Sequence, residues 1–122
     1  MTIMEAISQA DDTNKNPYSL KQKIIWLSRA EAMVKDIVDS HEGGEDVTFR
    51  GFDEHTDRNT VLIMQQPYDE CYIHWLQAQV YYANDEIDRY NRAITMFNAL
   101  FDDFKSYYKK NHTPKGYGRF LF

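Results

Sequence analysis

The 122-residue sequence contains a single cysteine, three prolines and five glycines, and it has no long uninterrupted run of apolar residues. Because a disulfide needs two thiols, Cys71 cannot form one within the chain, which suits a reducing compartment. A membrane-spanning helix needs about 20 apolar residues, and no segment approaches that length, so we expect no membrane partner. The N-terminus carries Glu5 and lacks the apolar core of a signal peptide, which predicts synthesis in a cytoplasm.

Basic residues are scarce except at the C-terminal end. The net charge is −5, yet residues 105–122 hold five basic and no acidic side chains, whereas residues 1–104 hold nine basic and nineteen acidic ones. Nucleic-acid binding as the main task needs a basic face, so this composition argues against it. A basic tail can dock on an acidic protein neighbour. Alternatively, Lys109 and Lys110 simply complement the dipole of a helix C-terminus.

Signatures of catalysis are also missing. The sequence has no glycine-rich phosphate loop and no Gly-x-Ser-x-Gly nucleophile elbow. Cys71 and His74 lie three residues apart, as in half of a zinc site, but no second ligand pair shows a matching spacing. We therefore expect no enzyme activity, no metal and no cofactor. A small enzyme or metal protein is the least favoured class.

Two helices are predicted within residues 1–41. Thr2 and Glu5 have the spacing of a capping box, which opens the first helix. Ser19 and Gln22 repeat this spacing and start a second helix that extends to about Ser40. Its expected buried face comprises Leu20, Ile24, Leu27, Val34, Ile37 and Val38.

Residues 42–66 lack helical periodicity, and residues 47–49 and 61–64 read as short strands. A connection of this length is long for a small domain and is commonly functional. We expect a projecting β-hairpin arm whose open edge pairs with a neighbouring subunit. A hairpin folded onto the helices is the alternative. The arm residues expected at the subunit contact are Val47, Phe49, Phe52, Val61 and Ile63.

Residues 67–112 predict one long helix, because two apolar rows continue through it with heptad spacing. The rows are Ile73, Val80, Ile87, Ile94, Phe101 and Tyr108, and Leu76, Ala83, Tyr90, Phe97 and Phe104. A helix of about 42 residues spans roughly 63 Å, whereas a compact chain of this length is about 35 Å across. The helix must therefore break into a hairpin or pack against other subunits, and we favour the second. The expected subunit-interface residues are Ile87, Tyr90, Ile94, Phe97, Phe101 and Phe104.

The overall prediction is a single, mainly all-α domain over residues 1–122. It consists of a three-helix subunit with a long C-terminal helix, the β-hairpin arm over residues 42–66, and an extended tail over residues 113–122. Large apolar side chains at a free chain end favour a docking peptide, with folding back on the same domain as the alternative. The expected docking residues are Lys115, Tyr117, Arg119, Phe120, Leu121 and Phe122.

Several segments together resemble a known family. They are Trp26-Leu27, His41-Glu42-Gly43-Gly44, Pro67-Tyr68-Asp69-Glu70-Cys71-Tyr72, Ala78-Gln79-Val80-Tyr81-Tyr82-Ala83-Asn84, Glu86, Arg89-Tyr90-Asn91, Phe97-Asn98 and His112-Thr113-Pro114-Lys115. In these segments the chain resembles the head–tail connector (adaptor) proteins encoded among the head genes of tailed phages and prophages.

The resemblance implies a structural virion protein at the capsid vertex. Its helical subunits form a ring, usually a dodecamer, beneath the portal protein, extend the DNA channel and offer a platform for the tail or a stopper protein. Terminal segments of such adaptors commonly grip the portal, which gives residues 115–122 a role. A net-negative lumen lets genomic DNA pass without specific binding.

Members of that group often carry Asn-Gly where this chain has Asn84-Asp85, and Asn-Asn where it has Asn91-Arg92. The missing glycine favours an unbroken helix here. The competing function is a coiled-coil regulatory or chaperone-like protein-binding module, because heptad rows are equally typical of coiled coils.

Overall fold

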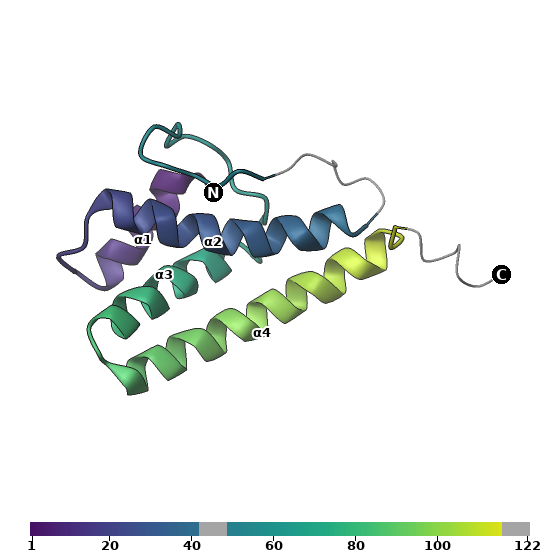
Figure 1. The fold of residues 1–122 in the computed structure, drawn as a ribbon. Helices are drawn as coiled ribbons and strands as arrows, with labels where there is room; N and C mark the ends of the chain where they lie inside the picture. The colour runs from purple at the N-terminus through teal and green to yellow at the C-terminus, as the bar shows by residue number, and fades with distance from the viewer. Residues whose placement is uncertain (42–48, 116–122) are drawn as a thin grey trace.

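A computed structural model describes residues 1–41 and 49–115 of the chain. These residues form four helices: α1 (Ile3–Thr13), α2 (Leu20–Asp39), α3 (Glu70–Ala83) and α4 (Ile87–Asn111). Helices α3 and α4 form an antiparallel hairpin, α2 crosses above it, and α1 lies behind α2 (Figure 1). The prediction of a mainly helical protein is confirmed, whereas the count of three helices is wrong.

Helices α1 and α2 begin as their capping residues predict. The N–H of Glu5 donates to Oγ1 of Thr2 (3.1 Å), and the N–H of Thr2 donates to a carboxylate oxygen of Glu5 (3.2 Å). The hydroxyl oxygen of Ser19 accepts from the N–H of Gln22 at 3.1 Å. Each cap satisfies backbone donors that have no partner within the helix.

The helix predicted over residues 67–112 is instead broken at residues 84–86. The N–H of Glu86 donates to the carbonyl of Tyr81 (2.9 Å), and the N–H of Asp85 donates to that of Tyr82 (3.1 Å). This pair of bonds is a Schellman motif, which ends a helix at a residue in the left-handed conformation. Asp85 occupies that conformation with a φ of 61°. Aspartate tolerates it better than most residues, so the turn forms without a glycine.

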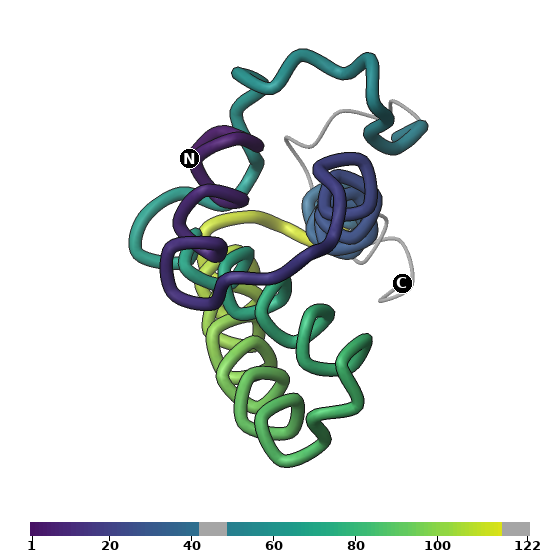
Figure 2. The backbone as a smooth tube through the Cα atoms, turned by 90° about the vertical axis from the view of Figure 1, so that its left-hand side faces the viewer, coloured from purple at the N-terminus to yellow at the C-terminus, as the bar shows by residue number. Residues whose placement is uncertain are grey.

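The hairpin buries within one subunit most of the two apolar rows that we expected other subunits to cover, although Ala83 and Ile87 stay exposed. Phe97 and Phe104 of α4 are each 4% exposed. The ring of Trp75 on α3 lies 5.0 Å from that of Phe97. In Figure 2 the two helices run side by side below α1 and α2. The length of the apolar pattern therefore no longer requires partner subunits.

The predicted β-hairpin arm is not present among the described residues of this segment, where only the isolated bridge between Thr2 and Val61 occurs. Residues 58–62 instead run along the start of α1. The N–H groups of Ile3 and Met4 donate to the carbonyls of Thr60 (3.0 Å) and Arg58 (3.1 Å). The segment thus satisfies free donors of the first turn of α1, which explains why it lies against the helix and forms no hairpin.

The same connection is also fixed to α2. The N–H of Phe52 donates to Oγ of Ser28 at 2.8 Å. Gly51 has a φ of 85°, and a Cβ at this position would lie 2.9 Å from the same hydroxyl oxygen. Only glycine therefore fits this approach without strain. Leu62 and Met64 continue into the core, where they are 2% and 0% exposed.

The core lies where α1, α2 and α3 meet. Its largest fully buried side chains are Tyr72, Ile3, Ile7, Ile24, Leu27, Met64, Val34 and Cys71. The indole N–H of Trp75 donates to the backbone carbonyl of Trp26 at 2.7 Å and ties α3 to α2. The predicted inner face of α2 is confirmed for Ile24, Leu27 and Val34, whereas Leu20, Ile37 and Val38 are partly buried.

Candidate interaction surfaces

An aromatic pocket lies between the C-terminal half of α4 and residues 63–68. The ring centroid of Tyr68 is 5.2 Å from that of Tyr107 and 5.9 Å from that of Phe104. Tyr108 continues the series, 5.7 Å from Phe104 and stacked on His112 at 3.8 Å. The volume is about 360 Å³, and the described lining residues are Ile63, Gln65, Gln66, Pro67, Tyr68, Phe104, Tyr107, Tyr108 and His112. A concave, largely aromatic surface with a few polar groups is typical of a binding site.

Two elements set the shape of this pocket. Phe104 and Tyr108 lie four residues apart on one face of α4, and the ring of His112, directly after the helix, stacks on Tyr108. Tyr107, beside them, is 46% exposed. Across the pocket, the N–H of Tyr68 donates to the carbonyl of Gln65 at 2.8 Å in a tight turn. The pocket therefore has a helical wall and a wall formed by a turn.

A buried polar cluster holds the turn in place. The hydroxyl of Tyr72 donates to one carboxylate oxygen of Glu31 (2.6 Å), and the N–H of Ile63 donates to the other (2.9 Å). The same hydroxyl accepts from the N–H of Met64 at 3.0 Å. Because Glu31 and Tyr72 are 3% and 0% exposed, water does not compete for these bonds. The cluster joins α2, α3 and the start of the turn.

Burial dominates the electrostatics of this cluster. It raises the pKa of the Glu31 carboxyl, and the hydrogen bonds from Tyr72 and Ile63 oppose the shift. It also raises the pKa of the Tyr72 hydroxyl, and the neighbouring carboxylate raises it further. The hydroxyl therefore stays protonated and keeps donating to Glu31.

Cys71 and His74, whose spacing is that of half a zinc site, are not joined by a third possible ligand among the described residues. Within residues 1–41 and 49–115, no group of three histidine, cysteine or acidic side chains is close enough to hold a metal ion. Cys71 is fully buried, and its Sγ lies 3.5 Å from the carbonyl oxygen of Phe97. Burial raises the pKa of its thiol to about 12, so the thiolate needed for nucleophilic attack is scarce at neutral pH.

The predicted interface residues of α4 are placed in two different environments. Phe97 and Phe104 belong to the core of the subunit, and Ile94 and Phe101 pack partly against it. Tyr90 is half-buried and contacts Tyr82, with ring centroids 5.4 Å apart. Only Ile87, at the start of α4, is clearly exposed, at 48%. Contacts with other molecules are therefore most accessible at the α3–α4 turn.

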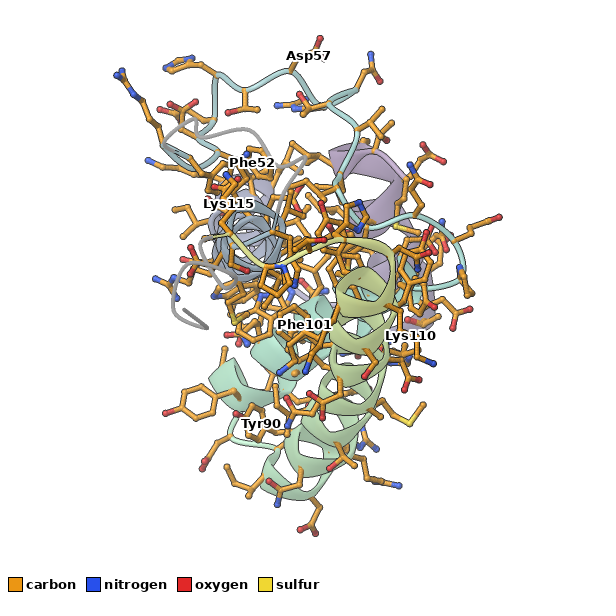
Figure 3. The ribbon with its side chains drawn as sticks, turned by 90° about the vertical axis from the view of Figure 1, so that its right-hand side faces the viewer. Phe52, Asp57, Tyr90, Phe101, Lys110 and Lys115 are labelled. Atoms are coloured by element: carbon orange, nitrogen blue, oxygen red, sulfur yellow. The ribbon has the colours of Figure 1, made fainter. Side chains whose placement is uncertain are left out.

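The predicted arm residues are dispersed over the described part of the connection. Phe49 and Phe52 contact each other edge to face at 5.3 Å. Val61 is 69% exposed, and Ile63 lies in the wall of the aromatic pocket. Val47 lies outside the described residues. Figure 3 shows Asp57 of this connection and Tyr90 of α4 at opposite ends of the molecule.

Of the predicted docking tail, only the first residue is described. The N–H of Lys115 donates to the carbonyl of Ser40 (2.8 Å), and Pro114 bridges to His41. Lys115 thus lies beside the end of α2, whereas Lys110 lies on α4 (Figure 3). The remaining tail residues lie outside the described range: Tyr117, Arg119, Phe120, Leu121 and Phe122.

A second groove lies on the α3–α4 hairpin, with a volume of about 480 Å³. It is lined by His74, Gln77, Tyr81, Arg89, Arg92, Ala93 and Met96. Arg89 is paired with Glu86 at 3.3 Å. Met96, also in the lining, is 49% exposed. This open surface combines apolar and basic side chains, as the exposed part of a protein–protein contact does.

Sequence reasoning missed the aromatic pocket. Phe104 belongs to a predicted apolar row, but Tyr68 lies 36 positions before it, and only the turn at Asp85 brings α4 back past residue 68.

No protein-family model, curated protein or solved structure matches the chain. Among the described residues, no helix is both long and apolar enough to cross a lipid bilayer.

Proposed function

We propose that this protein is a head–tail connector of a tailed phage or prophage. It forms a ring with neighbouring copies beneath the portal protein, extends the DNA channel and links the capsid to a tail or stopper protein. It acts as a structural protein of the virion, at the capsid vertex, without catalysis. The resemblance of segments distributed from Trp26 to Lys115 gives the proposal its starting point.

The observation that carries the proposal is the anchoring of the chain where its tail begins. The hydrogen bond from Lys115 to Ser40 and the bridge from Pro114 to His41 fix this point against the end of α2. The residues that follow combine Arg119 with four large apolar or aromatic side chains and no acid. A short basic and aromatic peptide on a fixed base is suited to docking on a partner protein.

Contacts between neighbouring copies are proposed at a smaller surface than the sequence indicated. Phe97 and Phe104 are occupied within the subunit, so they are no longer proposed for this role. The exposed side chains Tyr82, Ile87 and Met96 remain, and Met96 lines the second groove together with Arg89 and Arg92. In a ring this surface pairs with a different surface of the adjacent copy.

The charge of the chain suits a passage for DNA. The net charge is −5, and residues 1–104 carry nineteen acidic and only nine basic side chains, so most of the chain does not attract phosphate strongly. Genomic DNA is therefore proposed to pass without specific contacts.

Co-purification with the portal protein encoded in the same genome tests this proposal. The full chain is expected to bind portal rings, and a chain ending at Gly116 is expected to lose most of that binding. Asp12→Ala provides a control, because it changes an exposed side chain of α1 outside the tail, the pocket and the proposed contact between copies. Electron microscopy of the complex is expected to show a ring of added density under the portal. Undiminished binding by the shortened chain would contradict the role of the tail, and no binding by either chain would contradict the portal as the partner.

The coiled-coil alternative is the less favoured proposal. A coiled-coil module needs the heptad rows of one helix to be free for a partner helix. In this protein Leu76, Val80, Phe97 and Phe104 of these rows are buried within the subunit, at most 4% exposed, whereas Ile87 is exposed.

A further inference from the structure

We propose that, in the free subunit, the aromatic pocket at the end of α4 binds the C-terminal segment 117–122 of the same chain. This inference names a receptor for the tail within the subunit and does not require the portal protein. Its consequence for assembly, a tail that must leave the pocket before it docks elsewhere, rests on the proposed function.

Chain length permits this contact. His112, in the wall of the pocket, precedes Lys115 by three residues, so the two backbones are at most about 11 Å apart. Seven residues follow Lys115 and can span up to about 25 Å when extended. The tail is therefore longer than the path back to His112. Glycines at 116 and 118 permit the reversal of direction that this path requires.

The chemistry of the two surfaces is complementary. The pocket presents the exposed ring of Tyr107 beside Tyr68 and Tyr108, and its volume of about 360 Å³ lies within the range of small ligand sites. The tail supplies Phe120 and Phe122, whose rings can pack edge-on or offset against tyrosine rings. Gln65, Gln66 and His112 at the pocket supply polar groups that can bind tail backbone groups.

The covalent link favours the chain's own tail over the tail of another copy. A short flexible connection gives a tethered segment an effective concentration in the millimolar range. The tail of a separate copy, at the micromolar concentration of a dilute solution, cannot compete at equal affinity.

Methyl NMR on the full-length protein tests the proposal. The Ile63 methyl group is the reporter, because this side chain lines the pocket, and the Ile87 methyl group at the α3–α4 turn is the control. The double variant Phe120→Ala/Phe122→Ala is expected to move the Ile63 resonance and to leave that of Ile87 unchanged. Tyr107→Ala, on an exposed side chain, is expected to move Ile63 in wild-type protein and to abolish the further effect of the double variant.

A synthetic peptide with the sequence of residues 115–122 completes the test. Added to the double variant, it is expected to restore the wild-type Ile63 resonance, and it should bind wild-type protein at least about tenfold more weakly because the tethered tail competes. An Ile63 resonance unaffected by the double variant would overturn the proposal. A wild-type resonance that changes on tenfold dilution would also overturn it, because the tail would then come from another copy. Portal binding is not measured here, so failure of this inference is distinct from failure of the proposed function.

Discussion

The hydroxyl of Tyr72 on α3 donates a 2.6 Å hydrogen bond to the carboxylate of Glu31 on α2, and both side chains are almost completely buried. The same two residues bind the N–H groups of Met64 and Ile63. One pair therefore joins two helices to the segment that leads into the aromatic pocket.

Removing this hydroxyl is expected to destabilise the fold. Tyr72→Phe leaves the Met64 N–H without its acceptor and a Glu31 oxygen without its donor. Leaving a buried hydrogen-bonding group without its partner costs about 1–3 kcal/mol. We therefore expect the substitution to lower the unfolding free energy by about 2 kcal/mol. Urea denaturation measures it. Tyr82→Phe, at a ring that is 64% exposed, is the matched control and should change little. Equal effects of the two substitutions would contradict the buried network.

Stability should depend on pH through Glu31. Its pKa in the folded protein is raised above 4.5, so the folded state holds its proton more tightly than the unfolded chain. The contribution of Glu31 titration to the free energy of unfolding is therefore complete below pH 4.5, and it is lost as the pH rises through the folded-state pKa of the carboxyl. Glu31→Gln cannot titrate. The stability of the wild type relative to this variant should therefore fall as the pH rises from 4 to 8, as measured by urea denaturation at each pH. Parallel curves would show that the carboxyl is not buried as described.

Replacing aspartate by glycine is expected to change the stability of the protein in opposite directions at two nearby positions, one in the turn between α3 and α4 and one in the first turn of α4. Asp85→Gly relieves a left-handed residue and should stabilise the protein by about 0.5–1 kcal/mol. Asp88→Gly, in the first turn of α4, should destabilise it by a similar amount, because glycine disfavours helix and the helix dipole loses an acidic partner. Thermal denaturation compares the two. If Asp85→Gly also destabilises the protein, then residue 85 is helical and the hairpin is wrong.

Alanine substitutions at two positions of the same heptad pattern can distinguish the hairpin structure from a continuous helix that packs between subunits. Phe97→Ala is expected to cost about 3–5 kcal/mol, since this ring is buried within the subunit. Ile87→Ala should cost less than about 1 kcal/mol, because Ile87 is 48% exposed. Chemical denaturation at several protein concentrations measures both. Similar, concentration-dependent losses would instead indicate that other subunits bury the whole pattern.

The chain alone was sufficient to predict helical structure and where the first two helices begin. Thr2 and Ser19 cap α1 and α2 through bonds to residues only three positions away, so local sequence contains the whole signal. The heptad pattern likewise identified residues that become buried, such as Leu76, Phe97 and Phe104. The pattern does not indicate which surface covers these residues, because an apolar helix face packs equally well against its own chain or against another.

The course of the chain between these elements depended on contacts distant in sequence. Asp85 ends α3 without the glycine that usually marks such a turn, and the hydroxyl of Tyr18, 66 positions away, donates to the side chain of Asn84 beside it. The carbonyls of Arg58 and Thr60 bind the first turn of α1, in place of the strand pairing that the segment's composition favoured. Local preferences at these points differ by about 1 kcal/mol or less, so packing of the assembled helices was enough to decide between the alternatives.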